Sequence, residues 1–243
     1  MSSITWTPRA VASEARPCER ALWRAVEAQH IASTTRLVDD LGQQVLLEDI
    51  LEQSKPALPE EARGVHYLLS TPFRYPPLAR GSRFRSAADP GVFYGAREQR
   101  TACAELGYWR WRFLIDSPGL TEIGPVAQTV FQVKLAATAV DLRRKPFARD
   151  ARRWTDPDRY DATQELARAA REARVGLILY QSVRDPGDGE CGALLSPSGF
   201  ARPRRPVAEQ TWFLTINRSA SAWQRDGARY EFFWGGKTSP GGD

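Results

Sequence analysis

The sequence predicts an α+β fold, with a core of short, mostly antiparallel strands, flanking helices and a helix-rich N-terminal extension. Three observations predict this fold class. Strand-like runs do not alternate regularly with helical ones, which disfavours a doubly wound parallel sheet. The most strand-like runs follow residue 129, whereas the first third of the chain is rich in helical patterns. The length of 243 residues, with 42% hydrophobic and 26% charged residues, is typical of a soluble domain with a substantial core.

The N-terminal third predicts an arm followed by a helix. Residues 1–20 are polar and contain proline and arginine, so we expect a flexible arm there. From residue 21 to 235 we expect a single domain with a helical segment at 35–60, and we expect residues 236–243 to form a flexible tail. Within Thr35–Gln53, apolar side chains recur at helical spacing on one face, which predicts an amphipathic helix.

The clearest helix of the remaining chain is Arg97–Ile115, in which Thr101, Glu105, Trp109 and Phe113 recur at four-residue spacing. The other predicted elements are, in chain order, a strand or helix at Trp23–Gln29, a helix end or strand at Val65–Ser70, a proline-rich loop or edge strand at 71–86, strands at Gly91–Tyr94 and Thr129–Leu142, an alanine-rich helix at Tyr160–Arg174, and strands at Val175–Val183, Cys191–Leu195, Thr211–Asn217 and Tyr230–Trp234.

Charge and cysteine usage argue against several classes of protein. The net charge of +5 comes mostly from arginine, but basic residues are interspersed with acidic ones and do not form a nucleic-acid-binding arm. Cys18, Cys103 and Cys191 lie far apart without CxxC spacing, which argues against disulfides and structural zinc and favours a reducing cytoplasm. The sequence contains no run of about 18 apolar residues, so it predicts no membrane span. We therefore expect no metal, no membrane association and no direct contact with nucleic acid.

Three polar residues between Tyr75 and Phe113 are candidates for a ligand site. Arg83 lies in a loop rich in arginine, Tyr94 ends a short predicted strand, and Glu105 lies on the predicted helix. Arginine suits phosphate, and an aromatic ring can stack on a planar base. Because Glu105 is flanked by small apolar residues, we expect it to be partly buried and to need hydrogen-bond donors. A solvated basic loop and a structural ion pair are the alternatives.

Ser182 ends the most strand-like run and is the fourth candidate. A serine at a strand end can donate a hydrogen bond to a ligand, or it can stabilise a neighbouring turn. The sequence lacks the GxSxG elbow and a histidine partner, which argues against a serine hydrolase. It also lacks the GxGxxG and Walker A patterns, which argues against a Rossmann or P-loop enzyme.

Around these residues the sequence resembles the RES-domain family, the toxins of RES–Xre toxin–antitoxin systems. The matching text is WRAVEAQH around Arg24, GSRFR around Arg83, DPGVFYGA around Tyr94, TACAE around Glu105 and YQSVRDPGDGECGALL around Ser182. The resemblance extends from about Trp23 to Trp234. The chain departs from the common GGRWNPPG pattern, where it has GSRFRSAADPG, and its segment Leu37–Pro59 is longer than in compact members.

The resemblance implies an ADP-ribosyltransferase-like fold and an enzyme that takes NAD⁺ as a substrate and needs no cofactor. It implies that Arg24 and Arg83 hold the pyrophosphate and ribose, and that Tyr94 packs on nicotinamide or ribose. Glu105 would bind the ribose hydroxyls and stabilise positive charge on the sugar. Ser182 would fix the nicotinamide end or the acceptor. The physical chemistry agrees, since departure of nicotinamide leaves a cationic sugar that needs a fixed carboxylate.

The implied function is that of an NAD⁺-degrading cytoplasmic toxin, neutralised by a cognate Xre-type antitoxin. The nicotinamide–ribose bond would be broken by hydrolysis or phosphorolysis. Protein ADP-ribosylation is an enzymatic alternative, and a non-catalytic basic module that binds nucleic acid is an alternative of another class. The oligomeric state stays open, with a homo-oligomer among the alternatives.

Overall fold

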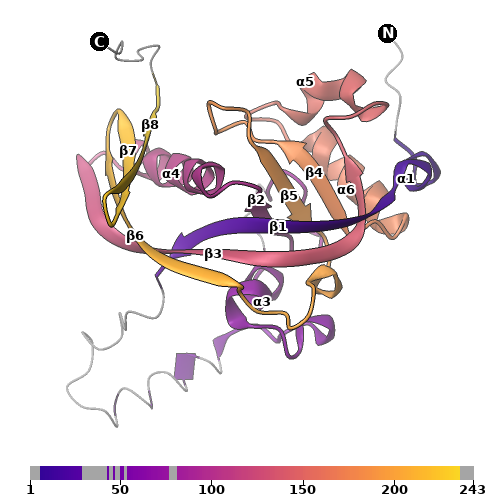
Figure 1. The fold of residues 1–243 in the computed structure, drawn as a ribbon, viewed down its shortest axis with the longest axis horizontal. Helices are drawn as coiled ribbons and strands as arrows, with labels where there is room; N and C mark the ends of the chain where they lie inside the picture. Colours follow the sequence, from indigo (N-terminus) through magenta and orange to yellow (C-terminus); the bar gives the residue numbers. More distant parts are fainter. Residues whose placement is uncertain are drawn as a thin grey trace.

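The computed structural model describes residues 6–28, 54–76 and 81–235, together with residues 43, 46, 50 and 51. In this part of the chain, strands from both ends of the sequence form a single sheet (Figure 1). Its order is β1-β2-β5-β4-β3-β6-β7-β8. The strands are β1 (Arg16–Glu27), β2 (Phe93–Ala96), β3 (Glu122–Asp141), β4 (Leu177–Gln181), β5 (Glu190–Leu194), β6 (Ala208–Asn217), β7 (Ala220–Arg225) and β8 (Ala228–Phe233).

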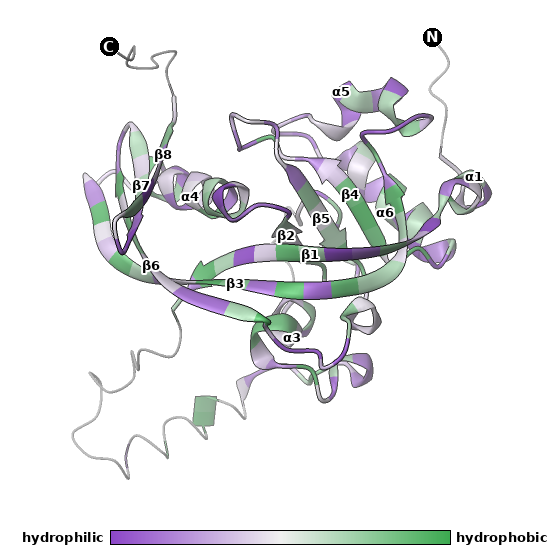
Figure 2. Cartoon of the chain, viewed as in Figure 1, coloured by the Kyte–Doolittle hydropathy of each residue, from purple (hydrophilic) through white to green (hydrophobic). Residues whose placement is uncertain are grey.

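The sheet is mostly antiparallel, as the sequence predicts. Among the described pairs, β3–β4 is the parallel one. The whole of β1 pairs with the long strand β3, from Arg16 opposite Ala139 to Glu27 opposite Gln128. Since β1 also pairs with β2 at Trp23 and Ala96, the strands β1, β2, β5, β4 and β3 close into a ring. Figure 2 shows hydrophobic and hydrophilic residues alternating along β1 and β3, as expected for strands that present different faces to core and solvent.

Five α-helices of the described residues lie around this sheet: α1 (Pro8–Glu14), α3 (Tyr67–Arg74), α4 (Gln99–Ile115), α5 (Ala151–Trp154) and α6 (Asp161–Glu172). Short 3₁₀ turns lie at Glu60–Ala62, Phe147–Asp150 and Pro197–Gly199. Figure 1 shows α4 and α3 on opposite sides of the long strands β1 and β3.

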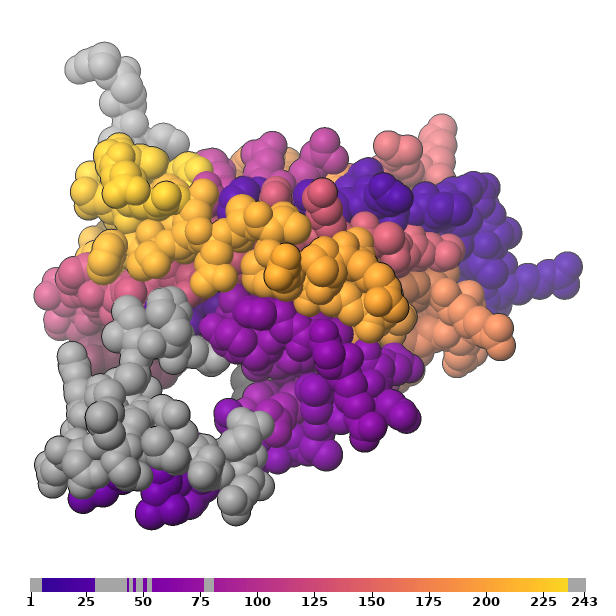
Figure 3. Space-filling view, turned by 60° about the horizontal axis from the view of Figure 1, so that its bottom comes forward, coloured from indigo at the N-terminus to yellow at the C-terminus, as the bar shows by residue number. Residues whose placement is uncertain are grey.

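The core consists of three clusters of buried apolar residues. One cluster includes Leu22, Phe93 and Leu177 from the ring, together with Phe73 of α3. A second joins the other side of β2, β5 and β4 to α6 and α1, and a third joins α4 to β6, β7 and β8. Figure 3 shows the segment that carries α3 lying against the residues that lead into β6, where the backbone N–H of His66 donates to the Arg204 carbonyl at 3.1 Å.

The predicted α+β class is confirmed, and the main differences concern short elements. The prediction of a flexible arm over residues 1–20 is wrong for the part that the structure describes, because α1 and the start of β1 lie there and Val11 is fully buried. The predicted loop after Ser70 is helical as far as Arg74, with Pro72 inside α3. Strand β7 was not predicted. Most of Thr35–Gln53 and the whole tail 236–243 lie outside the described residues.

Candidate functional site

The side chain of Glu105 projects from α4 towards the ends of β4 and β5. Its neighbours Cys103 and Ala104 are fully buried in the packing of α4 on the sheet, which fixes the orientation of this helix. Glu105 itself is partly exposed. Its Oε1 accepts a hydrogen bond from Ser182 Oγ at 2.5 Å and a weaker one from Cys191 Sγ at 3.9 Å. No hydrogen bond from the described residues reaches Oε2.

Ser182 is almost completely buried at the end of β4 and has no free hydrogen-bonding capacity on its hydroxyl group. Its oxygen accepts from the backbone N–H groups of Arg184, at 3.2 Å, and Asp185, at 2.9 Å. Its proton is donated to Glu105. A hydroxyl group has one donor and two acceptor positions. In this geometry Ser182 therefore contacts Glu105 and cannot also donate to a ligand.

Two arginines act on Glu105 from neighbouring loops. Arg83 and Arg184 are each only 8% exposed, and the positive charge of each favours the ionised form of Glu105. Burial, which disfavours the ionised form, has a larger effect than these charges. The pKa of Glu105 is therefore raised above its ordinary value. We call Arg83, Glu105, Ser182 and Arg184 the Glu105 cluster.

The guanidinium groups of both arginines are held by the end of α5 and the linker that follows it. Arg83 Nη1 donates to the carbonyl of Trp154 at 2.8 Å, and this guanidinium lies over the ring of Tyr160. Arg184 Nη2 donates to the carbonyl of Pro157 at 2.6 Å, and its guanidinium lies 3.8 Å from the ring centre of Tyr108. A backbone carbonyl oxygen therefore accepts a hydrogen bond from each of the two guanidinium groups.

Tyr94 lies beside the cluster and holds the turn that carries Arg83. Its hydroxyl group forms a 2.8 Å hydrogen bond with Ser82 Oγ and accepts from the backbone N–H of Phe84 at 3.0 Å. Burial raises the pKa of Tyr94. These contacts fix the two residues on either side of Arg83, so Tyr94 positions the turn through its hydroxyl group.

Arg24 is the predicted site residue that the structure does not bring to the cluster. It lies on β1 with its guanidinium 4.9 Å from the ring centre of Phe93, which faces the cluster of apolar residues inside the ring of strands. Tyr94, the next residue, packs against the opposite cluster, as alternation along a strand requires. Arg24 Nη1 donates to the Tyr94 carbonyl at 2.7 Å, and burial lowers the pKa of Arg24 to about 10.

Sequence reasoning missed Arg184 as a member of the cluster, and it missed the contacts of Asp185 with Thr101 and Arg100 that support the cluster. Asp185 Oδ2 accepts from Thr101 Oγ1 at 2.6 Å and Oδ1 accepts from Arg100 Nη1 at 2.5 Å. Asp185 is 6% exposed and Thr101 is fully buried. The sequence Asp185-Pro186-Gly187 is typical of a turn, but a turn pattern does not show which helix its aspartate contacts.

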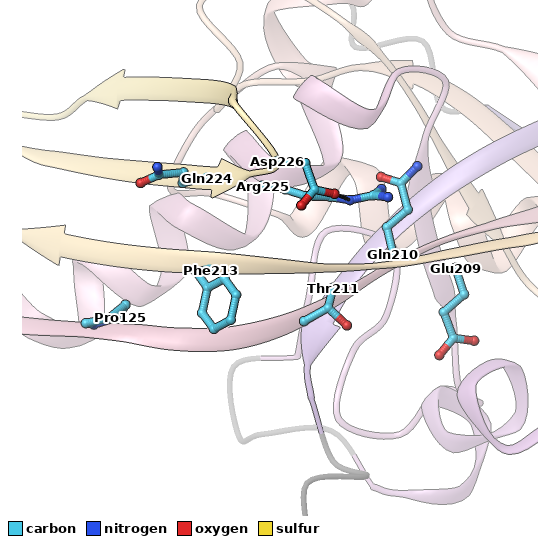
Figure 4. Close-up of a pocket in the computed structure, with 8 residues that line it drawn as sticks. All are labelled: Pro125, Glu209, Gln210, Thr211, Phe213, Gln224, Arg225 and Asp226. Atoms are coloured by element: carbon cyan, nitrogen blue, oxygen red, sulfur yellow. Dashed lines mark hydrogen bonds and ion pairs between the residues drawn. The ribbon is translucent and has the colours of Figure 1, made fainter.

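A groove elsewhere on the surface does not coincide with the cluster. Figure 4 shows it along β6 and β7, lined by Pro125, Glu209, Gln210, Thr211, Phe213, Gln224, Arg225 and Asp226. An ion pair at 3.0 Å joins Arg225 to Asp226. A partly buried carboxylate and two buried arginines lie at the Glu105 cluster, so we place the candidate site there. Within the described ranges, no group of His, Cys, Asp and Glu residues could hold a metal ion, and no helix could span a membrane.

The fold and the cluster define a mixed α/β domain with a partly buried glutamate between two arginines. The family model of the RES domain matches residues 58–217, and the chain therefore belongs to the RES domain family. The matched range contains Arg83, Tyr94, Glu105 and Ser182, whereas Arg24 precedes it.

One solved structure that is similar to this chain comes from the M. tuberculosis MbcT–MbcA toxin–antitoxin complex. The sequence identity is 14% and the TM-score is 0.47, and the similarity covers 82% of this chain and 86% of that chain. No curated protein sequence matches this chain.

Proposed function

We propose that this protein consumes NAD⁺ by breaking the bond between nicotinamide and ribose. The resemblance to RES–Xre toxins suggests the substrate, and the observation that carries the proposal is the environment of Glu105. One oxygen of its carboxyl group is held by Ser182, the other accepts no hydrogen bond from the described residues, and two arginine charges favour its ionised form. This is a fixed negative charge with one face available to a sugar.

In the proposed reaction the bond between ribose C1′ and nicotinamide N1 breaks, and its electron pair leaves with nicotinamide, which becomes neutral. The positive charge then resides on C1′ and the ring oxygen of ribose. A preorganised carboxylate stabilises this charge more in the transition state than in the ground state. The oxygen of water or phosphate bonds to C1′, and water loses one proton in this step. Nothing is oxidised or reduced, so NAD⁺ is a substrate and not a cofactor.

The two arginines of the cluster would bind the pyrophosphate of NAD⁺. Arginine offers a planar set of donors that suits phosphate oxygens, and charged acceptors form stronger hydrogen bonds than neutral carbonyls do. Arg83 and Arg184 would therefore exchange the carbonyls of Trp154 and Pro157 for phosphate oxygens. Tyr94 would lie next to the ribose or nicotinamide. Arg24 would take part only if its guanidinium left the ring of Phe93.

The test is to incubate the purified protein with NAD⁺ and follow released nicotinamide by chromatography. We expect the wild type to release nicotinamide, and the Glu105→Gln variant to be slower by roughly a hundredfold or more, because it loses a charge aimed at the transition state. The Glu122→Gln variant is the matched control, since it removes an exposed carboxylate at the start of β3 and should keep full activity. A folded wild type that leaves NAD⁺ intact would refute the proposal.

The second product identifies the acceptor. Free ADP-ribose indicates water, and an ADP-ribose phosphate that requires added phosphate indicates phosphorolysis. Label from NAD⁺ on a protein indicates ADP-ribosyl transfer. Steeply salt-dependent binding of nucleic acid without loss of NAD⁺ would support the non-catalytic alternative instead.

We also propose that a cognate Xre-type antitoxin neutralises this protein in the cytoplasm, as the family resemblance implies. Expression of the chain should lower cellular NAD⁺ and arrest growth, since the cofactor serves many essential reactions. Co-expression of the cognate antitoxin should restore both the NAD⁺ level and growth. Expression of the Glu105→Gln variant should leave the NAD⁺ level and growth unchanged. If growth stops while cellular NAD⁺ stays constant, toxicity has another cause.

A further inference from the structure

The loop between β4 and β5 is tied to α4 by one buried carboxylate. Asp185 accepts hydrogen bonds from Arg100 and Thr101, both in the first turn of α4, and from the backbone N–H of Gly187 at 3.0 Å. Arg100 and Asp185 also form an ion pair, in which the Asp185 side chain is 4% exposed. The same helix carries Glu105 one turn further on. Asp185 thus links the helix of Glu105 to the loop of Ser182.

This link extends to the hydroxyl group that holds Glu105. The backbone N–H of Asp185 donates to Ser182 Oγ, and the backbone N–H of Ser182 donates to the Gly189 carbonyl at 2.8 Å. Both contacts close the loop upon itself. The orientation of the Ser182 hydroxyl group is therefore set by the backbone of the loop, and the loop is set by the side chain of Asp185.

The packing around Asp185 leaves no room for a side chain at Gly189. A Cβ atom added to Gly189 would lie 2.2 Å from Thr101 Oγ1 and 2.8 Å from Asp185 Oδ2. These separations are far below van der Waals contact, so this corner of the loop can approach α4 only as glycine. The contact between the loop and the helix is a close-fitting one, and it does not depend on a flexible surface ion pair.

We propose that Asp185 is a positioning residue, which fixes the Ser182 hydroxyl group and through it the carboxylate of Glu105. The proposal rests on the proposed function insofar as Glu105 is the carboxylate that acts on the sugar. Asp185 does not touch Glu105 and would not contact the substrate. It acts by holding the loop in the one conformation that lets Ser182 donate to Glu105 Oε1.

The ionisation of Glu105 reports on this conformation. The charged and titratable groups that face Glu105 are Arg83 and Arg184 from two loops, Tyr180 from β4 and Cys191 from β5. The hydrogen bond from Ser182 favours the ionised form. Loosening the loop should weaken this bond and raise the pKa of Glu105. Removal of the negative charge of Asp185 alone, without movement, would lower it.

The first test is the Asp185→Asn variant, with the pKa of Glu105 measured by NMR of protein labelled with ¹³C in the glutamate carboxyl groups. The Glu105→Gln variant assigns the signal. We expect the pKa of Glu105 to rise, and kcat to fall by up to about a hundredfold with little change in KM, because the carboxylate is displaced from the reacting sugar. A pKa that falls or stays constant overturns the proposal.

The second test asks whether Asp185 acts through Ser182. In the Ser182→Ala background the hydroxyl group is absent, so Asp185→Asn should cause no further rise in the pKa of Glu105. An equal rise in both backgrounds would mean that Asp185 acts by another route, and the proposal would be wrong.

The third test uses a pair of variants at Thr101 that leave all charges in place. It can replace the first test if Asp185→Asn does not fold. Thr101→Val removes the donor to Asp185 and keeps the side-chain shape, whereas Thr101→Ser keeps the donor. We expect Thr101→Val to raise the pKa of Glu105, and Thr101→Ser to leave it at the wild-type value. Equal pKa values in the two variants would contradict the proposal. The NMR readout needs no turnover, so it tests Asp185 even if the wild type does not consume NAD⁺.

Discussion

At the scale of single residues, the carboxyl group of Glu105 is subject to opposing effects. Burial disfavours its charged form, while the hydrogen bond from Ser182 and the charges of Arg83 and Arg184 favour it. Burial is the largest of these effects, so the pKa of Glu105 is raised. Glu105 therefore loses its charge at a pH where an exposed glutamate is still ionised. The proposed reaction should fail below that pH, because it requires the carboxylate.

The raised pKa of Glu105 predicts that the Glu105→Gln variant becomes more stable relative to wild type as the pH rises. Because the pKa of Glu105 is higher in the folded state than in the unfolded state, the folded protein binds more protons between the two pKa values. Wild-type stability therefore falls as the pH rises through this window. Glutamine carries no charge that must be desolvated, so the variant escapes this loss.

Thermal unfolding between about pH 4 and about pH 8 measures the effect. The Tm of Glu105→Gln relative to wild type should increase with pH and then level off. Glu122→Gln, which removes an exposed carboxylate, should show no such increase. A difference in Tm between Glu105→Gln and wild type that is independent of pH would contradict the raised pKa.

Sequence reasoning at this scale was correct about burial and incomplete about partners. Small apolar neighbours predicted that Glu105 would be partly buried and would need a donor, and the structure confirms the partial burial. The protein donor is Ser182, and Arg83 acts through its charge. The two residues of this hydrogen bond are 77 positions apart, so no local sequence pattern specifies that they meet.

At the scale of elements, α3 packs unusually closely against the chain that leads into β2. A Cβ atom added to Gly91 would lie 2.4 Å from Phe73 Cα and 2.5 Å from the Pro72 carbonyl oxygen. Both are backbone atoms, which cannot move without moving the helix. This contact holds α3 over the apolar cluster inside the ring of strands.

We therefore expect Gly91→Ala to destabilise the protein by about 1–3 kcal/mol, the usual cost of overpacking. Urea-induced unfolding measures the loss. Gly119→Ala is the matched control, because nothing lies within 4 Å of a Cβ atom at that position and its backbone needs no glycine. If both variants unfold at the same urea concentration, the close contact between Gly91 and α3 is contradicted.

The long helix α4 could be predicted from the sequence, whereas α1 and β7 could not. The helix predicted at Arg97–Ile115 corresponds to α4, because its length lets residues at four-residue spacing define it. Helix α1 has only seven residues, too few for such a pattern, and β7 is six residues with small side chains at its start. The pairing of β1 with β3 joins segments more than a hundred residues apart, and no local pattern specifies it.

At the scale of the whole molecule, the sheet assembles the candidate site from segments that are distant in the sequence. Glu105 comes from α4, Ser182 and Arg184 follow β4, and Arg83 precedes β2. The end of α5 and the linker that follows it contact both arginines. The N-terminal residues that were expected to form a flexible arm pack near this linker, since Trp6 and Val11 share an apolar cluster with Trp154 and Leu166. Trp6 and Val11 are therefore part of the packed core.

The N-terminal packing predicts that Trp6→Ala is strongly destabilising. Trp6 is 7% exposed, its ring lies 4.2 Å from that of Phe147, and its Nε1 donates to Asp150 Oδ2 at 2.9 Å. Truncation of a buried tryptophan leaves a cavity and costs about 3–5 kcal/mol. Trp109→Ala, which removes a tryptophan that is 50% exposed on α4, should cost clearly less when both are measured by urea-induced unfolding. A Trp6→Ala variant as stable as wild type would restore the interpretation of residues 1–20 as a flexible arm.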